Sequence, residues 1–549
     1  MIDQMQDEGL AKRDIAELAL MKAERAPYEE MYRAIDELYP DGAGGFNPMG
    51  AGQLRGQNLF DGTHIIANSR FAAAGVAITT PEESGYIRPR FLDPELMKQP
   101  RVQRWCWNTG QRLYGIRHAV HTGFMTAANE DWDQLGRYGT SPMWCDQMPD
   151  GRGLFYRALH LSSTFIGVDF SGLVNRCTVV MEKRADQLEA MFGREALTPK
   201  MIEALEKNKP ETMFELLRIV APASEWDADA FDWRRFPIAS RWLACDEKMF
   251  LQRKGYHSMP VSVSRHMTAP GEIYGRSPAI RMHSAIAGLQ AMRKTTLRAA
   301  HKAVDPALAF NNDDGVTRII SKPGGMNPGL VDDNGRLLVA RMPGGENGLP
   351  WAQGELEQER SQVRTEFFEE FFKILTDPNS RMTQLEVMQV MAKQGALVRP
   401  FASRYATEKQ HPISQREIDL ALRAGQIEPL PPEVLEAGAW PLIEYENQLA
   451  EMARAESTNK TLRFMEFAGQ VAAVEQSPVA DTIDTDAMLR GGAIEIGVNP
   501  EYLFPPEQAQ ANRAKRAEAA AGPLDAENLG AVSGAALDLA KANQISAAA

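Results

Sequence analysis

Apolar residues recur at helical spacing in two segments, and the pattern between the segments is different. Ser277 can cap a helix and Pro278 suits its first position, so we expect a helix from there to about Val304. A second helix is expected over residues 355–375, ending before Asp377-Pro378. The apolar positions of the two segments are Ile286, Leu289, Leu297 and Val304, then Val363, Phe367, Phe368, Phe371, Phe372, Ile374 and Leu375.

Residues 305–353, between these helices, carry short apolar runs separated by glycine and proline. Such runs predict short strands and turns. The expected strands are Ala307–Phe310, Val316–Ser321 and Leu337–Arg341. The pattern therefore predicts a helix that leaves a globular body, a small β unit at its end, and a helix that returns.

The two helices differ in charge. No acid occurs from Tyr274 to Val304, whereas the second helix is rich in glutamate. One explanation is a ring of identical chains, in which the basic face of one copy meets the acidic face of the next. An ordinary helical hairpin with solvated faces is the alternative. The residues that we assign to the faces between copies are Lys294, Arg298, Lys302, Glu359, Glu366 and Glu370.

The N-terminal region is expected to be helical. Residues 10–38 show one amphipathic pattern, divided at Pro27, and residues 67–77 form an alanine-rich helix. A third helical pattern covers 101–132.

From Ser141 the period changes to two, which predicts a small antiparallel sheet or barrel. The expected strands are 141–145, 155–160, 164–168, 174–182, 214–220, 238–246 and 256–263, with helices at 185–192 and 199–208.

After the second long helix the chain returns to helical patterns. Thr383 and Glu386 form a capping box that begins one of them. Further helices are expected at 413–424, 441–454 and 461–474. The alanine-rich end, residues 511–549, is expected to fray.

Charge, cysteine spacing and hydropathy exclude several classes of protein. The chain has 60 basic and 73 acidic residues and a net charge of -13, which argues against a protein that binds nucleic acid tightly through its phosphates. Four cysteines without close spacing indicate reduced thiols in a cytosolic protein. The first residues lack the pattern of a signal peptide, and no apolar run is long enough to cross a membrane.

No constellation of residues points strongly to catalysis. A phosphate-binding Gly-x-x-x-x-Gly-Lys-Ser/Thr loop does not occur, so we expect no cofactor and no ATP-driven motor. Three groups of residues could hold a metal or act in catalysis, but we expect each of them to be structural or solvated side chains. They are His118 with His121, then Asp481, Asp484 and Asp486, then Glu130, Asp131 and Asp133.

The order of short motifs resembles the portal (head-to-tail connector) proteins of short-tailed double-stranded DNA phages. In that family a Tyr-Gly-Arg-Ser-Pro turn starts the stem helix, and Tyr274–Pro278 matches it. A Pro-Gly-Gly-hydrophobic-Asn segment follows, as at Pro323–Asn327. A second stem helix then leads to a Thr-x-x-Glu-Val helix start, as at Thr383–Val387. Upstream, Phe60–Thr63 is similar to a family Phe-Asp-x-Thr step.

The resemblance implies an α+β, mostly α portal fold with helical wing, β-rich barrel-like unit, two-helix stem, small β clip and helical crown. It also implies a division of the chain, which we give by residue number. The wing would be 1–273 and 383–429, the stem helices 274–304 and 354–375, the clip 305–353, the tunnel loop 376–382, the crown 430–510 and the flexible tail 511–549.

By the same resemblance, the protein would be a non-enzymatic ring, of twelve copies in the family, at the capsid vertex of a virion assembled in the host cytoplasm. Its partners would be duplex DNA, the terminase large subunit, a tail adaptor, and the capsid and scaffolding proteins. The tunnel-loop residues expected near DNA are Asn379, Ser380 and Arg381, and the clip residues expected in docking are Arg318, Lys322, Arg336 and Arg341.

Two other functions stay open at this point. One is a different virion structural protein, such as an ejection or scaffold component, and the other is a hydrolase or nuclease with an unrecognised site.

Overall fold

The structure is a computed structural model, and it divides into two compact units. One unit contains residues 1–90, 109–429 and 441–450, and the other contains 91–108, 430–440 and 451–549. The residues that the structure describes are 2–40, 45–48, 56, 58–81, 86–148, 151, 153–224, 226–310, 319–320, 324–327, 330–331, 334–342, 349–369, 400–445, 490–491, 502–504 and 506–521.

The N-terminal helices are longer or more divided than the sequence predicts. Helix α1 (Ile2–Leu38) is continuous and contains Pro27 within it, so the predicted division there is wrong. Helix α2 (Thr63–Thr79) extends the predicted segment at both ends. The predicted helix over 101–132 is two helices, because Gly123, at φ 67°, separates α4 (Pro100–Arg117) from α5 (Phe124–Tyr138).

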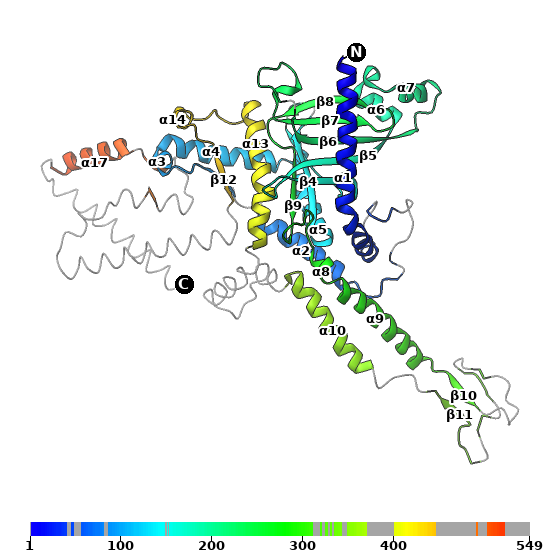
Figure 1. Cartoon of the computed structure of the whole chain (residues 1–549). Helices are drawn as coiled ribbons and strands as arrows, with labels where there is room; N and C mark the ends of the chain where they lie inside the picture. The colour runs from blue at the N-terminus through cyan, green and yellow to red at the C-terminus, as the bar shows by residue number, and fades with distance from the viewer. Residues whose placement is uncertain are drawn as a thin grey trace. The chain divides into compact units, whose positions relative to one another are not determined.

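The β-rich part consists of two antiparallel sheets (Figure 1). The three-stranded sheet has the order β3-β2-β9, and the five-stranded sheet has the order β4-β5-β6-β7-β8. This confirms antiparallel pairing, but the predicted strand 256–263 belongs to two strands that lie in different sheets. The strands are β2 (Thr140–Gln147), β3 (Leu154–Ala158), β4 (Thr164–Val168), β5 (Val174–Arg184), β6 (Met213–Pro222), β7 (Ile238–Ala244), β8 (Met249–Tyr256) and β9 (Val261–Arg265).

Two short helices, α6 (Ala185–Phe192) and α7 (Pro199–Glu206), follow β5 as predicted. Their apolar side chains pack with Phe214, Leu216 and Trp242 of the five-stranded sheet. On the same sheet, the Arg218 guanidinium lies 3.4 Å from the ring centroid of Trp144 in β2 and 4.9 Å from that of Trp242. Stacking of this arginine therefore joins the two sheets.

Two buried ion pairs hold helices against neighbouring elements of the body. Asp14 of α1 accepts two hydrogen bonds of 2.7 Å from Arg241 of β7. Lys409 donates to Asp131 of α5 at 2.6 Å, and both side chains are buried. Because an unpaired charge in such a position is costly, the first pair fixes α1 on the five-stranded sheet and the second fixes the segment around residue 409 against α5.

A helical stretch from residue 400 runs through a π-helical turn, Ala406–Gln410, into α13 (His411–Arg423). Gly425, at φ 67°, follows the end of α13, as predicted. The helix predicted from 441 is wrong at its start. Residues Leu442–Tyr445 form β12, which pairs antiparallel with β1 (Ile87–Arg90).

The other unit is described by its own core. Helix α3 (Pro94–Lys98), the first half of α4 and α14 (Pro432–Glu436) pack around Trp105, Leu96 and Val434. Helix α17 (Pro506–Ala521) is also in this unit.

Several predicted features lie outside the described residues, and they remain predictions. They are the tunnel-loop residues Asn379, Ser380 and Arg381, the clip residues Arg318 and Lys322, the stem residue Glu370, the helix start at Thr383, the 461–474 helix and the acidic group at 481–486.

Candidate functional site: a braced helix pair with a β tip

Two antiparallel helices and a small β unit project from the sheets of the first unit, as Figure 1 shows. The first helical part is a short helix, α8 (Pro278–Arg281), followed by α9 (His283–Val304). The second is α10 (Leu349–Glu366), which begins six residues before the predicted 355. It also ends at Glu366, and Phe368 has a φ of 57°, so the prediction of one continuous helix to 375 is wrong. The helices pack through Ile286 and Leu289 of α9 and the buried residues of α10, Leu356 and Val363. We call α9 and α10 the helix pair.

The start of the helix pair is fixed by a close backbone crossing. The Ser277 hydroxyl accepts from the amide of Ile280, as predicted for a cap, and donates to the carbonyl of Arg137 at 2.7 Å. A Cβ on Gly275 would lie 2.1 Å from the carbonyl oxygen of Gly139. Because no side chain fits there, glycine is required at position 275 for the chain to enter α8.

A turn before α2, Phe60–Thr63, braces both helices. The side-chain oxygen of Gln290 in α9 accepts from the amides of Phe60 (2.7 Å) and Asp61 (2.9 Å), and its nitrogen donates to the Asp61 carbonyl (2.7 Å). The buried Asp61 carboxylate accepts two hydrogen bonds from Arg360 of α10, at 2.9 and 2.7 Å. One turn thereby holds a residue of each helix.

The Asp61 carboxylate is ionised in this environment. Burial acts to raise its pKa, but hydrogen bonds from Thr63 and the charge and hydrogen bonds of Arg360 outweigh burial, so the pKa is lowered. The sequence offered only a family similarity at Phe60–Thr63. The contacts of Asp61 with Gln290 and Arg360 are the physical reason for these residue types. A search for local sequence patterns could not find these contacts, because Gln290 and Arg360 lie about 230 and 300 residues after Asp61.

An aromatic cluster lies where α10 meets the body. Phe71 of α2 packs edge-on against Phe367 and Trp132, at centroid distances of 6.1 and 5.4 Å. His266 lies 4.5 Å from Phe401 and 6.4 Å from Phe368. Burial lowers the pKa of His266 to about 4, so the ring is neutral at physiological pH. This cluster anchors the chain on both sides of residues 370–399.

The charged residues predicted to lie between copies differ in exposure and in their contacts within the chain. Among the described residues, no ion pair joins α9 to α10. Arg298 and Lys302 are exposed, and Glu359 is half-buried on the flank of α10. Two other predicted residues are engaged within the chain: Glu366 pairs with Arg281 at 2.5 Å, and the Lys294 ammonium lies 5.3 Å from the ring centroid of Phe60.

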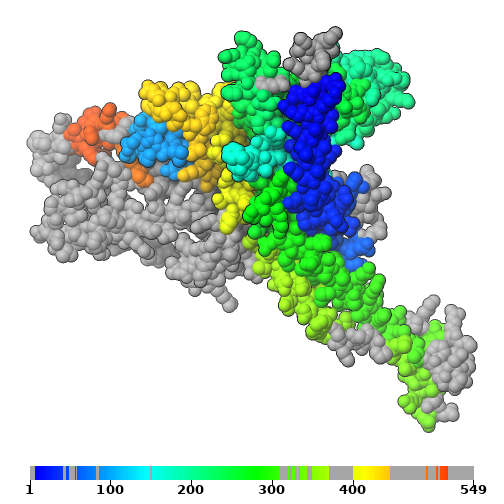
Figure 2. Space-filling view, in the orientation of Figure 1, coloured from blue at the N-terminus to red at the C-terminus, as the bar shows by residue number. Residues whose placement is uncertain are grey.

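The end of the helix pair carries a two-stranded antiparallel sheet of β10 (Leu308–Phe310) and β11 (Val339–Arg341). We call the described residues from 305 to 342 the β tip; Figure 2 shows it as the far end of the projection. Arg336 and Arg341 are exposed in it. So are several apolar side chains, namely Leu308, Ile320, Met326, Val331, Leu337 and Met342.

The structure describes two of the three candidate metal or catalytic groups, since Asp481, Asp484 and Asp486 lie outside the described residues. No group of three or more potential metal ligands is found within the described ranges. Asp131 is held by Lys409, Tyr405 and Ser264 and is a structural residue. His118 and His121 are not on one helix, because α4 ends at Arg117; burial, and secondarily the nearby Arg117 charge, lower the pKa of His118 to about 4.

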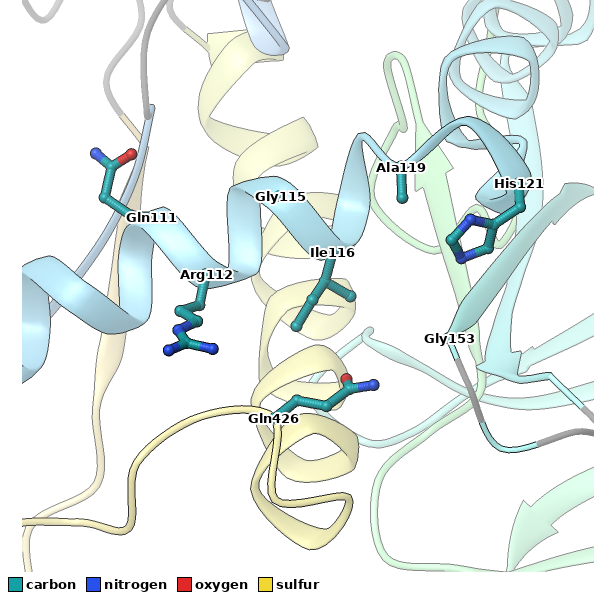
Figure 3. Close-up of a pocket in the computed structure, with 8 residues that line it drawn as sticks. All are labelled: Gln111, Arg112, Gly115, Ile116, Ala119, His121, Gly153 and Gln426. Carbon is teal, nitrogen blue, oxygen red and sulfur yellow. The ribbon is translucent and has the colours of Figure 1, made fainter.

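A surface cavity of about 510 Å³ lies beside His121, and Figure 3 shows its lining. It is bordered by one side of α4 and by Gly153 and Gln426. The residues that line it are Gln111, Arg112, Gly115, Ile116, Ala119, His121, Gly153 and Gln426. Because this set includes no carboxylate, cysteine or serine, it offers no nucleophile with an adjacent base.

Comparison with known proteins decides the family. The sequence model of the family described as bacteriophage head to tail connecting protein matches residues 12–503. The chain belongs to this family. The match confirms the resemblance that the short motifs indicated, and it covers the helix pair and the β tip as well as both sheets.

Two curated relatives of this head to tail connecting protein carry informative names. A "Probable portal protein" of Bordetella phage BPP-1 is 24% identical over 516 residues, covering 91% of this chain and 89% of the relative. A "Portal protein" of Salmonella phage epsilon15 is 22% identical over 543 residues, covering 93% and 91%. No helix in the described part of this family member has the length and hydropathy that crossing a membrane requires.

Proposed function

We propose that this chain is a phage portal protein: a ring of identical copies at one capsid vertex, through which DNA is packaged and ejected. The observation that carries the proposal, beside the family membership, is the helix pair. Its two helices pack on each other, yet none of the described charges of α9 pairs with a charge of α10. Among the described residues, Arg298 and Lys302 of α9 and Glu355 and Glu359 of α10 have no ion-pair partner, so these charges are available to another molecule.

The outer face of α9 suits close packing by a neighbouring copy. Its exposed positions are small near the body and basic toward the β tip, and no acid interrupts them. The small ones are Ser284, Ala287, Gly288, Ala291 and Thr295, the two bases are Arg298 and Lys302, and His301 and Val304 are also exposed at the β-tip end. Small side chains shorten the distance at which two helices can pack, and the two bases can pair with acids of the next copy.

The acids that remain for such pairing are on one flank of α10. Glu355 and Glu359 are half-buried and have no ion-pair partner among the described residues. Glu366 is excluded from this set, because Arg281 already neutralises it. We therefore propose Arg298 and Lys302 against Glu355 and Glu359 as the contact between copies, with Glu370 as a further candidate.

The β tip is proposed as the clip that docks the packaging terminase and then the tail adaptor. A two-stranded sheet is marginal in water on its own, and exposed apolar side chains on it indicate a surface that is covered in the assembly. Arg336 and Arg341 are exposed beside those side chains. Asn379, Ser380 and Arg381 remain our candidates for the loop that touches DNA.

The first experiment is electron microscopy of the purified chain, in which we expect rings with a central hole. Arg298→Glu with Lys302→Glu should abolish rings, and adding Glu355→Arg with Glu359→Arg should restore them. The matched control is Lys200→Glu with Lys209→Glu, two exposed lysines on and just after α7, which should leave rings intact. A wild-type chain that forms only monomers under every assembly condition would contradict the proposal.

A second experiment addresses enzymatic function. Incubation of the rings with duplex DNA and magnesium should leave the DNA uncut, as expected for a structural channel. A nuclease activity that copurifies with the rings through two successive purification steps would instead support the nuclease alternative.

A further inference from the structure

The surface cavity beside His121 is bordered by polar side chains that have no partner. They come from α4, from the turn after α4 and from the segment after α13 (Figure 3). Among the described residues, none of these side chains has a hydrogen-bond or ion-pair partner. The four side chains are those of Gln111, Arg112, His121 and Gln426. Their hydrogen-bonding groups are therefore available to a ligand.

Arg112 gives the cavity a positive charge that the lining does not neutralise. The residues that line the cavity include no carboxylate. Arg117, further along α4, is by contrast buried and paired with Glu417. Figure 3 shows Arg112 and Ile116 extending from the same side of α4, the side on which Gln426 lies. The Arg112 guanidinium can therefore receive a carboxylate from another molecule, through hydrogen bonds that charge strengthens.

Small residues keep the cavity open beside an apolar surface. The α4 side of the lining is formed by Gly115, Ile116 and, just after the helix, Ala119. A Cβ on Gly115 would meet no atom within 4 Å, so the space next to it is open. A Cβ on Gly153 would lie 2.7 Å from Nε2 of His121, so glycine at 153 leaves room for the imidazole. An apolar group of a ligand can thus reach Ile116.

This lining favours one class of ligand. Duplex DNA requires several cations for its phosphates, whereas the lining contains one arginine. A nucleobase would stack on a phenylalanine, tyrosine or tryptophan, and none lines the cavity. A single inorganic anion would leave most of the 510 Å³ unfilled. A peptide segment can supply an acid, an apolar side chain and backbone polar groups together.

We propose that this cavity is a docking site for another protein, whose peptide segment there carries a carboxylate side chain next to an aliphatic one. The carboxylate pairs with Arg112. The aliphatic side chain contacts Ile116 and Ala119, and the peptide backbone bonds to His121 and Gln426. This inference goes beyond the proposed function, because neither the channel nor docking at the β tip involves this cavity.

Fluorescence anisotropy with the purified chain tests the charge of the site. The probe is a fluorescein-labelled peptide, Gly-Ser-Leu-Leu-Asp-Ser-Gly, amidated at its C-terminus. We expect saturable binding that weakens at least ~10-fold when asparagine replaces the aspartate of the probe, and equally when Arg112→Ala is introduced. Arg104→Ala, exposed on the same helix and outside the cavity, is the matched control and should bind the probe as the unsubstituted chain does.

A second variant fills the cavity and keeps its charge. Gly115→Leu places a side chain in open space on a helix, where leucine is a better helix former than glycine, so the chain should fold. It should bind the probe at least ~10-fold more weakly. Gly9→Leu, at an exposed glycine of α1 with equally open surroundings, should bind normally. Absence of saturable binding to the unsubstituted chain, or equal binding to the Gly115→Leu chain, would overturn the proposal.

Two further measurements distinguish other occupants. Inorganic phosphate that displaces the probe as well as unlabelled peptide does would make the cavity an anion site. A changed oligomeric state of the Gly115→Leu chain in analytical ultracentrifugation would assign the cavity to a second copy of this chain. Either result would overturn the proposal, and we expect neither.

Discussion

In the body of the protein, two pairs of charged side chains are buried between packed elements. On the outer half of α9, the charged side chains are exposed and form no ion pair with any residue that the structure describes. Asp14 with Arg241 and Asp131 with Lys409 are satisfied inside one chain. Arg298 and Lys302 have no such partner among the described residues. The buried pairs stabilise a single copy, whereas the exposed bases of α9 are available to bind a second copy.

The largest effect is expected from breaking a buried pair. Lys409→Met leaves the Asp131 carboxylate buried without its cation, so the free energy of unfolding should fall by about 3 to 5 kcal/mol. Urea denaturation of the isolated chain measures it, with Lys302→Met as the exposed control. A loss below about 1 kcal/mol would show that Asp131 is satisfied by Tyr405 and Ser264 alone.

The brace at the base of the helix pair should give the next largest effect. Asp61→Ala removes the acceptor of the Arg360 bonds and leaves that guanidinium half-buried, at a cost of about 2 to 3 kcal/mol. Hydrogen exchange should show faster exchange in α9 and α10 near Gln290 and Arg360, with α6 and α7 unchanged. Uniform acceleration throughout the chain would argue that the turn stabilises the whole unit and not the helix pair.

A pH dependence is expected from His266. Its folded pKa of about 4 lies below the ordinary 6.5 because of burial, with Arg281 and Arg404 adding to the effect. As pH falls below 6.5 the unfolded chain takes up the proton first, so stability is full above pH 6.5 and is lost between 6.5 and 4.

His266→Phe, among Phe71, Phe368 and Phe401, should remove about 2 kcal/mol of the stability change between pH 7 and pH 5. Denaturation at the two pH values measures it. Phe368→Leu, a substitution without a titrating group in the same cluster, is the control and should change the stability equally at both pH values. Identical profiles for unsubstituted and His266→Phe chains would refute the assignment.

The smallest effect on the single chain should come from the unpaired bases. Arg298→Ala and Lys302→Ala should each change its free energy of unfolding by less than about 0.5 kcal/mol, because neither side chain has an ion-pair partner in the part of the chain that the structure describes. Loss of stability comparable to that of Lys409→Met would mean that these bases are bound within one copy.

The sequence predicted the parts of the fold that local patterns determine. The Ser277 cap, the end of the first long helix at Val304 and the helices after β5 follow from capping and periodicity, and the structure confirms them. The strand of residues 442–445 could not be predicted, because its partner β1 is about 350 residues away. Helix α1 continues through Pro27 because tertiary contacts on both sides of the proline, by Met21 and Tyr32, override the local preference.

Of the candidate site, sequence reasoning found the helix pair, its charge difference and the family. It did not find the brace, the use of Glu366 inside the chain, or the cavity beside His121. Each of these depends on which side of a helix faces a distant segment, and amphipathic periodicity gives only an approximate apolar side. The wing, clip, tunnel-loop and crown boundaries remain predictions.

The π-helical turn at Ala406–Gln410 sets a limit on how the chain can change in length. A π turn holds one residue more than an α turn, and each residue rotates a helix by about 100°. Deleting one residue there would turn α13 on its axis and carry Arg416 and Glu417 away from Asp146 and Arg117, to which they are bound. The loss of one residue would therefore break two ionic contacts. We expect relatives that have the same buried contacts to keep the same number of residues in this turn.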